Sequence, residues 1–90
     1  EIVVDNNVIT PNGDGKNDVW MVRNLDRYPD HKVSIFDRAG RLVFQGKDYK
    51  NSWDGTHNGK PLNEDAYYYV IEVGKGYGLL RGSVTIVRDR

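Results

Sequence analysis

β-Branched residues outnumber the best helix formers in this chain, and this imbalance limits the folds that the chain can adopt. Val and Ile together account for 16 residues, whereas Leu and Ala together account for 7. Branched side chains lose rotamer freedom on a helix and pack well on a pleated sheet. Ten glycines and six tyrosines fit the same picture, with glycines at turns and aromatic rings on strands. The composition therefore predicts an all-β fold.

Short apolar runs separated by Gly, Pro, Asn and Asp recur along the chain. The runs that we expect to form strands are Ile2–Val4, Val8–Ile9, Val19–Arg23, Lys32–Asp37, Arg41–Gln45, Ala66–Val73 and Leu80–Arg88. About seven short strands with regular turn signals predict an immunoglobulin-like antiparallel β-sandwich. The polar segment from Gly46 to Asp65, around Trp53, contains no run that we expect to be a strand.

Alternation along the strands indicates which side chains face the interior. The residues that we expect inside are Val33, Ile35, Tyr69, Ile71, Val84 and Ile86. The assignment of Val33 and Ile35 competes with Phe36, which lies on the opposite face of the same strand and also favours burial. Gly40 follows Arg38 and Ala39 between two strands, and we expect it to hold a positive φ in a hairpin turn.

One segment leaves a helix open as an alternative. Asp18–Tyr28 contains neither Gly nor Pro, and Val19, Val22 and Leu25 would lie on one face of a helix. Asn17 or the first Asp would cap it. Short apolar runs discriminate poorly between helix and strand, and the strand is the preferred interpretation.

Size and charge exclude several classes of protein. A chain of 90 residues is expected to be one domain, and because it opens with Glu1 we expect it to be a segment of a longer polypeptide. The formal net charge is zero, so no general positive field is available to grip nucleic acid or an anionic membrane. No Cys is present, which excludes disulfides and thiolate metal sites. No apolar run approaches the ~18 residues of a membrane span.

The loop from Asn12 to Asp18 is a candidate calcium site. When Asp14 and Gly15 take the fifth and sixth positions of a calcium loop, Thr10 is first, Asn12 third, the Lys16 carbonyl seventh and Asp18 ninth. The ligand set is incomplete, because the twelfth position, where a bidentate acid belongs, is Met21. We therefore expect an ordered turn built by Asn, Asp and Gly, with calcium bound by Asn12, Asp14, Lys16 and Asp18 as the alternative.

Catalysis has little support in the sequence. His31 and His57 lie in polar contexts, and Asp54 is three residues from His57, close enough to suggest a dyad. The three serines, however, lack the strand-to-helix setting of a nucleophile elbow. We expect a protein that is not an enzyme and needs no cofactor.

Trp53 has two interpretations. With Tyr49, and with Asn51, Asp54 and Asn58 nearby, it could form a platform that stacks against a sugar. The preferred interpretation is that Trp53 belongs to the core and closes the polar segment over the sandwich, since the neighbouring Asx-Gly pairs need no ligand to explain them.

Several motifs, in order and at consistent separations, resemble a known family. The opening motif is Thr10-Pro11-Asn12-Gly13-Asp14-Gly15-Lys16-Asn17-Asp18-Val19-Trp20, and the later blocks are Leu25–Pro29, Val33–Gly40 with Val43-Phe44, Trp53–Thr56 with Asn58–Lys60, Ala66–Ile71 and Gly82–Arg88. Together they resemble the gliding-motility-associated C-terminal domain, the type B sorting domain of the type IX secretion system of Bacteroidetes. Ala39, where an aromatic residue is usual, and Asn63–Asp65, where a Pro-Gly-Thr type of turn is usual, depart from the pattern.

The resemblance implies a C-terminal address label fused to the end of a larger secreted or surface cargo. It implies recognition by outer-membrane type IX machinery, passage through the periplasm, and a final location outside the cell or on its surface. The motif residues that it points to are Thr10, Pro11, Asn12, Gly13, Asp14, Gly15, Asn17, Asp18, Asp37, Arg38, Gly40, Trp53, Asp54, Gly55, Asn58 and Gly59. An immunoglobulin-like adhesive module that binds glycan or calcium by itself is the alternative function.

Overall fold

The computed structural model describes residues 1–88, which form strands and one short 3₁₀ helix. In chain order the elements are β1 (Val3–Val4), β2 (Val8–Ile9), β3 (Val22–Arg23), η1 (Leu25–Arg27), β4 (Lys32–Phe36), β5 (Leu42–Lys47), β6 (Thr56–His57), β7 (Lys60–Pro61), β8 (Asp65–Glu72) and β9 (Leu79–Ile86). The prediction of an all-β sandwich is confirmed. Within this part of the chain, no helix has the length and apolar character that crossing a bilayer requires.

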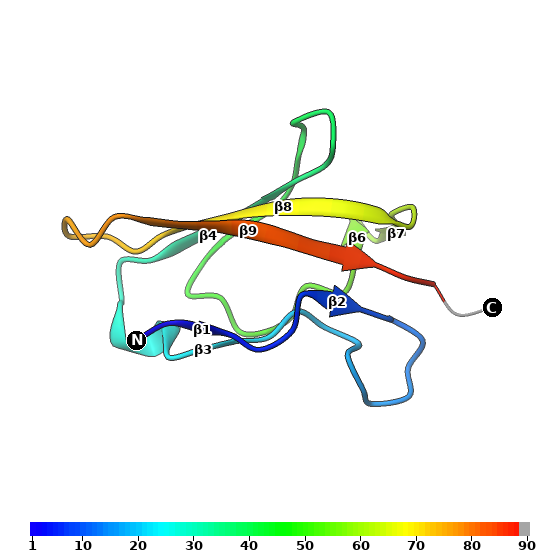
Figure 1. Cartoon of the computed structure of the whole chain (residues 1–90), viewed down its shortest axis with the longest axis horizontal. Coiled ribbons are helices and arrows are strands. Elements are labelled where there is room, and N and C mark those ends of the chain that lie inside the picture. The colour runs from blue at the N-terminus through cyan, green and yellow to red at the C-terminus, as the bar shows by residue number, and fades with distance from the viewer. Residues whose placement is uncertain (89–90) are drawn as a thin grey trace.

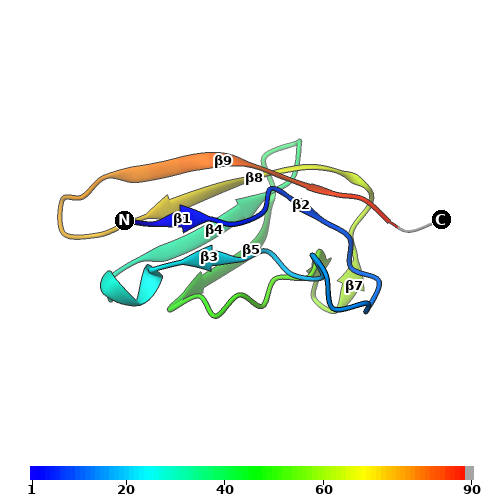
Figure 2. The ribbon, with the colours of Figure 1, turned by 60° about the horizontal axis from the view of Figure 1, so that its bottom comes forward.

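Five strands make the main sheet, in the order β2-β9-β8-β4-β5 (Figures 1 and 2). The long hairpin β8–β9 runs in register from Asp65 opposite Ile86 to Glu72 opposite Leu79. β4 pairs antiparallel with both β8 and β5. The short strand β2 pairs parallel with β9, and in this respect the sheet differs from the antiparallel arrangement that we expected.

The second layer is small and begins with a strand that changes sheets. β1 pairs with β3, and after three residues the chain crosses to the main sheet as β2 (Figure 2). Asn6 holds the crossing, because its side-chain amide donates to the Val19 carbonyl at 3.0 Å and its oxygen accepts from the Met21 amide at 2.8 Å. The layer is completed by extended and looped chain rather than by long strands.

Buried apolar side chains from both layers form one cluster. Its members are Ile9, Trp20, Val22, Leu25, Val33, Ile35, Val43, Tyr49, Trp53, Tyr67, Ile71, Val73, Val84 and Ile86. Val33 and Ile35 are fully buried, so the competition with Phe36 is decided in their favour, and Phe36 is half-buried. Tyr69 is half-buried and packs against this cluster. The interior prediction is otherwise confirmed.

Two expectations about local structure need correction. The alternative helix over Asp18–Tyr28 is wrong, because the segment contains β3 and then only the one-turn η1. The polar segment is not free of strands, because β6 and β7 form a hairpin around Asn58 and Gly59. These two residues have φ of 52° and 80°, the positive values that a two-residue hairpin loop with right-handed twist requires.

Candidate recognition surface

The Asp18 carboxylate organises the loop Thr10–Asp18. Its Oδ1 accepts hydrogen bonds from the backbone amides of Asn12 and Gly13 at 3.1 and 3.0 Å, and its Oδ2 accepts from the Gly15 amide at 2.7 Å. These bonds favour the charged carboxylate and hold the pKa of Asp18 below its usual value, with the Gly15 amide as the largest cause. One side chain therefore anchors three backbone groups of an exposed loop.

Two further Asx side chains complete the loop. Asn12 Oδ1 accepts from the Asp14 amide at 3.1 Å, and Asp14 Oδ1 accepts from the Lys16 amide at 2.8 Å. The Thr10 amide donates to the Asn17 carbonyl at 2.7 Å and so closes the base of the loop. The expected ordering by Asx and Gly geometry is confirmed.

The same contacts bear on the calcium alternative. The side-chain oxygens of Asn12, Asp14 and Asp18 accept hydrogen bonds from loop amides, and Thr10 Oγ1 donates to the Lys16 carbonyl at 3.4 Å. These bonds order the loop without a cation. Among residues 1–88 no group of three or more acidic, His or Cys side chains gathers as a metal site.

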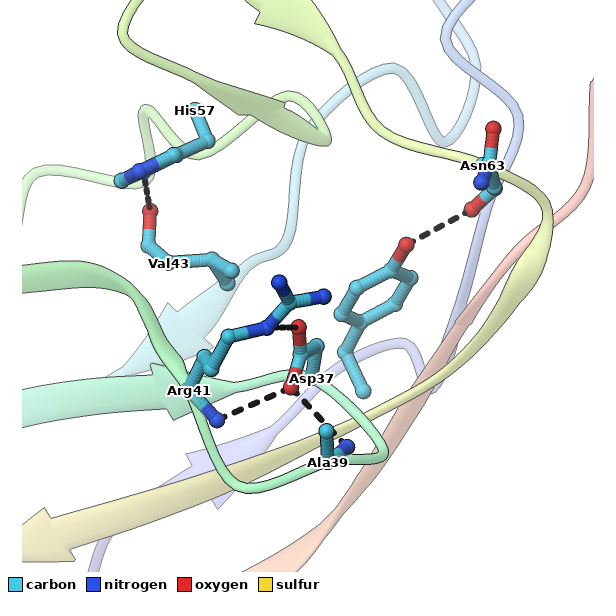
Figure 3. A network of polar contacts seen from close by, with 7 residues as sticks. Asp37, Ala39, Arg41, Val43, His57 and Asn63 are labelled. Carbon is cyan, nitrogen blue, oxygen red and sulfur yellow. Dashed lines mark hydrogen bonds and ion pairs between the residues drawn. The ribbon is translucent and has the colours of Figure 1, made fainter.

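A second turn, Asp37–Arg41, is built in the same way between β4 and β5 (Figure 3). Asp37 Oδ1 accepts from the amides of Ala39 and Arg41 at 2.9 Å each, and Oδ2 accepts from Arg41 Nε at 2.8 Å. These contacts lower the pKa of Asp37, first through the Arg41 amide and also through its guanidinium. Gly40 has a φ of 86°, as predicted. Ala39 is exposed at this turn.

Contacts to neighbouring strands hold this turn against the sheet. Arg38 forms an ion pair with Asp65 at the start of β8, with Nη2 and Oδ1 2.9 Å apart.

Figure 3 also shows the His57 ring beside the Val43 carbonyl, with Nδ1 3.0 Å from that oxygen. Since Asp54 instead accepts from the Thr56 hydroxyl at 2.8 Å, no Asp54–His57 dyad forms.

Trp53 is part of the core, with 2% of its surface exposed, and Tyr49 is 6% exposed. The sugar-stacking interpretation is therefore wrong, because neither ring presents a face to solvent. The Trp53 indole N–H donates to the Thr56 carbonyl at 3.1 Å and so links the two ends of the motif segment Trp53–Thr56. Gly55 has a φ of 81°, and a Cβ there would meet Ile86 Cδ1 at 3.0 Å, so both conformation and space favour Gly.

A buried hydrogen-bond network around Tyr49 was not anticipated from the sequence. The Tyr49 hydroxyl donates to the Trp20 carbonyl at 2.6 Å and accepts from the Trp53 amide at 3.0 Å. The Tyr49 amide donates to His31 Nε2 at 2.9 Å, so His31 carries its hydrogen on Nδ1, which faces the Tyr28 carbonyl at 2.7 Å. His31 is thus buried and structural rather than in a polar loop. Burial raises the pKa of Tyr49 to about 12.

Two of the three motif loops lie toward one end of the molecule. In both views the loop Thr10–Asp18 and the β6–β7 hairpin lie at the end where β9 finishes, away from η1 and the β8–β9 turn (Figures 1 and 2). Arg88, two residues after β9, stabilises this end, since its guanidinium donates to the carbonyls of Gly55 and Leu62 at 3.1 and 2.7 Å. The motif residues thus divide into buried supports and an exposed set of turns.

A comparison with models of protein families identifies the family of this chain. The model of the CHU_C Type IX secretion signal domain matches residues 2–86, which include both motif turns and the buried network. The chain belongs to this family. The searches of curated proteins and of solved structures each found no significant match.

Family membership confirms the resemblance to a type IX sorting domain and gives the protein a coarse function. The chain carries a type IX secretion signal, which implies a secreted or cell-surface protein and a secretion machinery that handles it. The family is one of secretion signals and not a catalytic one.

Proposed function

We propose that this chain is a non-catalytic sorting domain, acting as a single unit, that outer-membrane type IX machinery recognises as a folded surface. In this proposal a larger cargo is fused on its N-terminal side and passes through the periplasm to the cell surface or the medium. The observation that carries the proposal is the family match over residues 2–86.

The geometry supports recognition of shape rather than of a linear peptide. The motif residues Thr10–Asp18 are held by hydrogen bonds within the loop, and Asp37 binds its own turn. Trp53 and Gly55 are buried. A reader of the signal therefore meets turns whose backbone is fixed by the fold, and most motif side chains maintain that backbone. The loop surface is metal-free in this proposal, since the side-chain oxygens of Asn12, Asp14 and Asp18 accept hydrogen bonds that order the loop without an ion.

A reporter fusion tests the proposal. The chain is fused to the C-terminus of a periplasmically exported fluorescent protein in a bacterium with a functional type IX system. We expect the reporter in the medium or on the surface, and in the periplasm when a translocon gene is deleted. Retention of the reporter in both strains would contradict the proposal. Binding to a glycan array without secretion would instead favour an adhesive module.

Variants separate shape from side-chain contact. Gly40→Val places a branched residue at a φ of 86°, so we expect lower stability and lower secretion together. Charge reversal at exposed Lys47 or Lys50 should leave both unchanged. The measurement is secreted yield plotted against melting temperature. A variant as stable as the native domain yet unsecreted identifies a contact residue, and several of these within Asn12–Asp18 would make that loop the receptor site.

A further inference from the structure

The two edges of the five-stranded sheet differ in how they are covered. At the β5 edge the register with β4 shifts between Ile35 and Phe36, and the His57 ring from the β6–β7 hairpin lies against the Val43 carbonyl. Irregular pairing and coverage are means by which proteins keep a sheet edge from pairing with other chains. The β5 edge is therefore protected around Val43, next to the register shift.

The β9 edge has a neighbour along only part of its length. β2 pairs with Thr85 and Ile86, and the amides of Thr85 and Val87 donate to the carbonyls of Asn7 and Ile9 at 2.9 Å each. The strand that precedes β2 in the chain, β1, lies in the other layer, where it pairs with β3 (Figure 2). Within residues 1–88, the stretch Leu79–Ser83 thus has β8 on one side and no strand on the other. We call this stretch the open edge.

The direction of the backbone groups along the open edge follows from alternation. Successive residues of a strand point their amide and carbonyl groups to opposite sides. Since the Thr85 amide points toward β2, the groups of Leu79, Arg81 and Ser83 point to the same side, away from β8. Each of these three residues offers one donor and one acceptor to an additional strand.

The side chains of the open edge indicate which kinds of side chain an added strand would present to it. Within the described residues, the Arg81 side chain takes part in no ion pair, and Val70 lies opposite it on β8. Leu79 and Leu80 are 49% and 39% exposed. A hollow beside the edge is lined by Val4, Asp5, Asn7, Tyr69, Gly82 and Ser83. The edge combines unpaired backbone groups, apolar flanks and one uncompensated positive charge.

We propose that the open edge binds an extended segment of a partner protein, with an acidic side chain of that segment opposite Arg81. Strand addition of this kind takes its affinity from main-chain hydrogen bonds and its selectivity from alternate side chains. The inference rests on the proposed function, with the partner being the component that reads the signal.

Charge argues against a second copy of the chain as the occupant. Antiparallel pairing of two copies through all three outward residues places Leu79 opposite Ser83 and Arg81 opposite Arg81 of the other copy. Like charges directly opposite each other destabilise a strand pair. The acidic partner segment removes this repulsion and pairs the charge.

Proline substitution tests the backbone part of the inference in the reporter fusion. Arg81→Pro removes an outward amide that β8 does not use, and edge strands tolerate Pro at such positions. Lys47→Pro is the matched control, because the same alternation carried across the sheet points its amide outward from β5. We expect Arg81→Pro to lower the secreted fraction about 3- to 10-fold, which is the effect of losing about one main-chain hydrogen bond to the partner. Lys47→Pro should change secretion less than about twofold, below the effect of one such bond.

Charge variants and crosslinking complete the test. Arg81→Glu should lower secretion at an unchanged melting temperature, and Arg81→Lys should retain it. A photoreactive residue in place of Leu79 should crosslink to a protein other than the fusion itself. Native secretion by folded Arg81→Pro or Arg81→Glu overturns the inference, as does a crosslinked dimer of the fusion. Where Arg81→Pro fails to fold, Arg81→Glu decides. If the native fusion itself is not secreted, the proposed function has failed.

Discussion

The exposed loop Thr10–Asp18 and the buried cluster of Trp20, Tyr49 and Trp53 both lie within the residues that the family model matches, yet they are stabilised in different ways. The loop is held by short-range bonds from Asx side chains to backbone amides, in contact with solvent. The cluster joins two segments that are distant in the sequence through ring packing and a shared hydroxyl, with Trp20 and Tyr49 centroids 5.6 Å apart. Changes in the cluster should therefore cost global stability, and changes in the loop should act locally.

Trp53→Ala should have the largest effect. It removes a fully packed ring that contacts Tyr67 edge-on, with centroids 5.9 Å apart. We expect the free energy of unfolding to fall by about 3–5 kcal/mol. Chemical denaturation measures this, with exposed Ser52→Ala as the neighbouring control. If Asp18→Ala proves more destabilising than Trp53→Ala, the division between support and surface is wrong.

Alkaline pH should have the next largest effect, by destabilising the cluster. Because the pKa of Tyr49 is about 12 in the folded protein and 10 when exposed, the unfolded state ionises first. The stability from this group is complete below pH 10 and is lost as the pH rises toward 12, by up to about 2–3 kcal/mol. Burial raises the pKa of Tyr67 and Tyr69 in the same direction.

Tyr49→Phe isolates the contribution of this one residue. At neutral pH the variant leaves the Trp20 carbonyl and the Trp53 amide without the hydroxyl, which should cost about 1–3 kcal/mol. Between pH 10 and 12 the variant should lose less additional stability than the native protein. Equal losses in the two proteins would show that the pKa of Tyr49 is not raised in the folded protein.

Acid should affect the loop more weakly. The pKa values of Asp18 and Asp37 are lowered in the folded protein, so their contribution is present above about pH 4 and is lost as the pH falls through the folded values. Both carboxylates are near solvent, which makes the effect small. In Asp18→Asn, the melting temperature should depend less on pH between pH 4 and 2 than in the native protein. Nuclear magnetic resonance titration of the carboxyls should show the lowered pKa directly. A steeper decline in Asp18→Asn contradicts the anchoring role of Asp18.

Calcium should have the smallest effect, with no change in melting temperature up to millimolar concentration. The reason is that Asn12, Asp14 and Asp18 already accept loop hydrogen bonds. Magnesium serves as the control for a general effect of divalent ions. A rise with calcium alone that disappears in Asp14→Ala would establish the metal alternative.

Local chemistry made much of this fold predictable. Aromatic and branched residues in alternation located β8 and β9, and Arg38-Ala39-Gly40 located the β4–β5 turn because Gly40 tolerates its φ of 86°. The β6–β7 hairpin was missed although Asn58-Gly59 is a strong turn signal, because the flanking residues Thr56, His57, Lys60 and Pro61 lack an apolar alternation. Pattern alone underestimates a hairpin that buries little surface.

Contacts between distant segments could not be predicted in this way. His31 and Tyr49 lie 18 residues apart, and their polar sequence surroundings say nothing of the bond between them. The same holds for the Tyr49 hydroxyl, which meets Trp20 across 29 residues. Burial of these polar groups is favourable only because each finds its partner, and partners are set by the packing of the whole chain.

The sequence by itself determined the all-β class, the positions of the main turns and the family, since each depends on residues close together or on their order. The tertiary structure decided which aromatic rings are buried, which acids hold the loops, and that the first strand changes layers at Asn6 and leaves Leu79–Ser83 open. These outcomes depend on non-local pairing. A strand edge is open or covered according to where another segment lies, and no local pattern within β9 specifies the position of that segment.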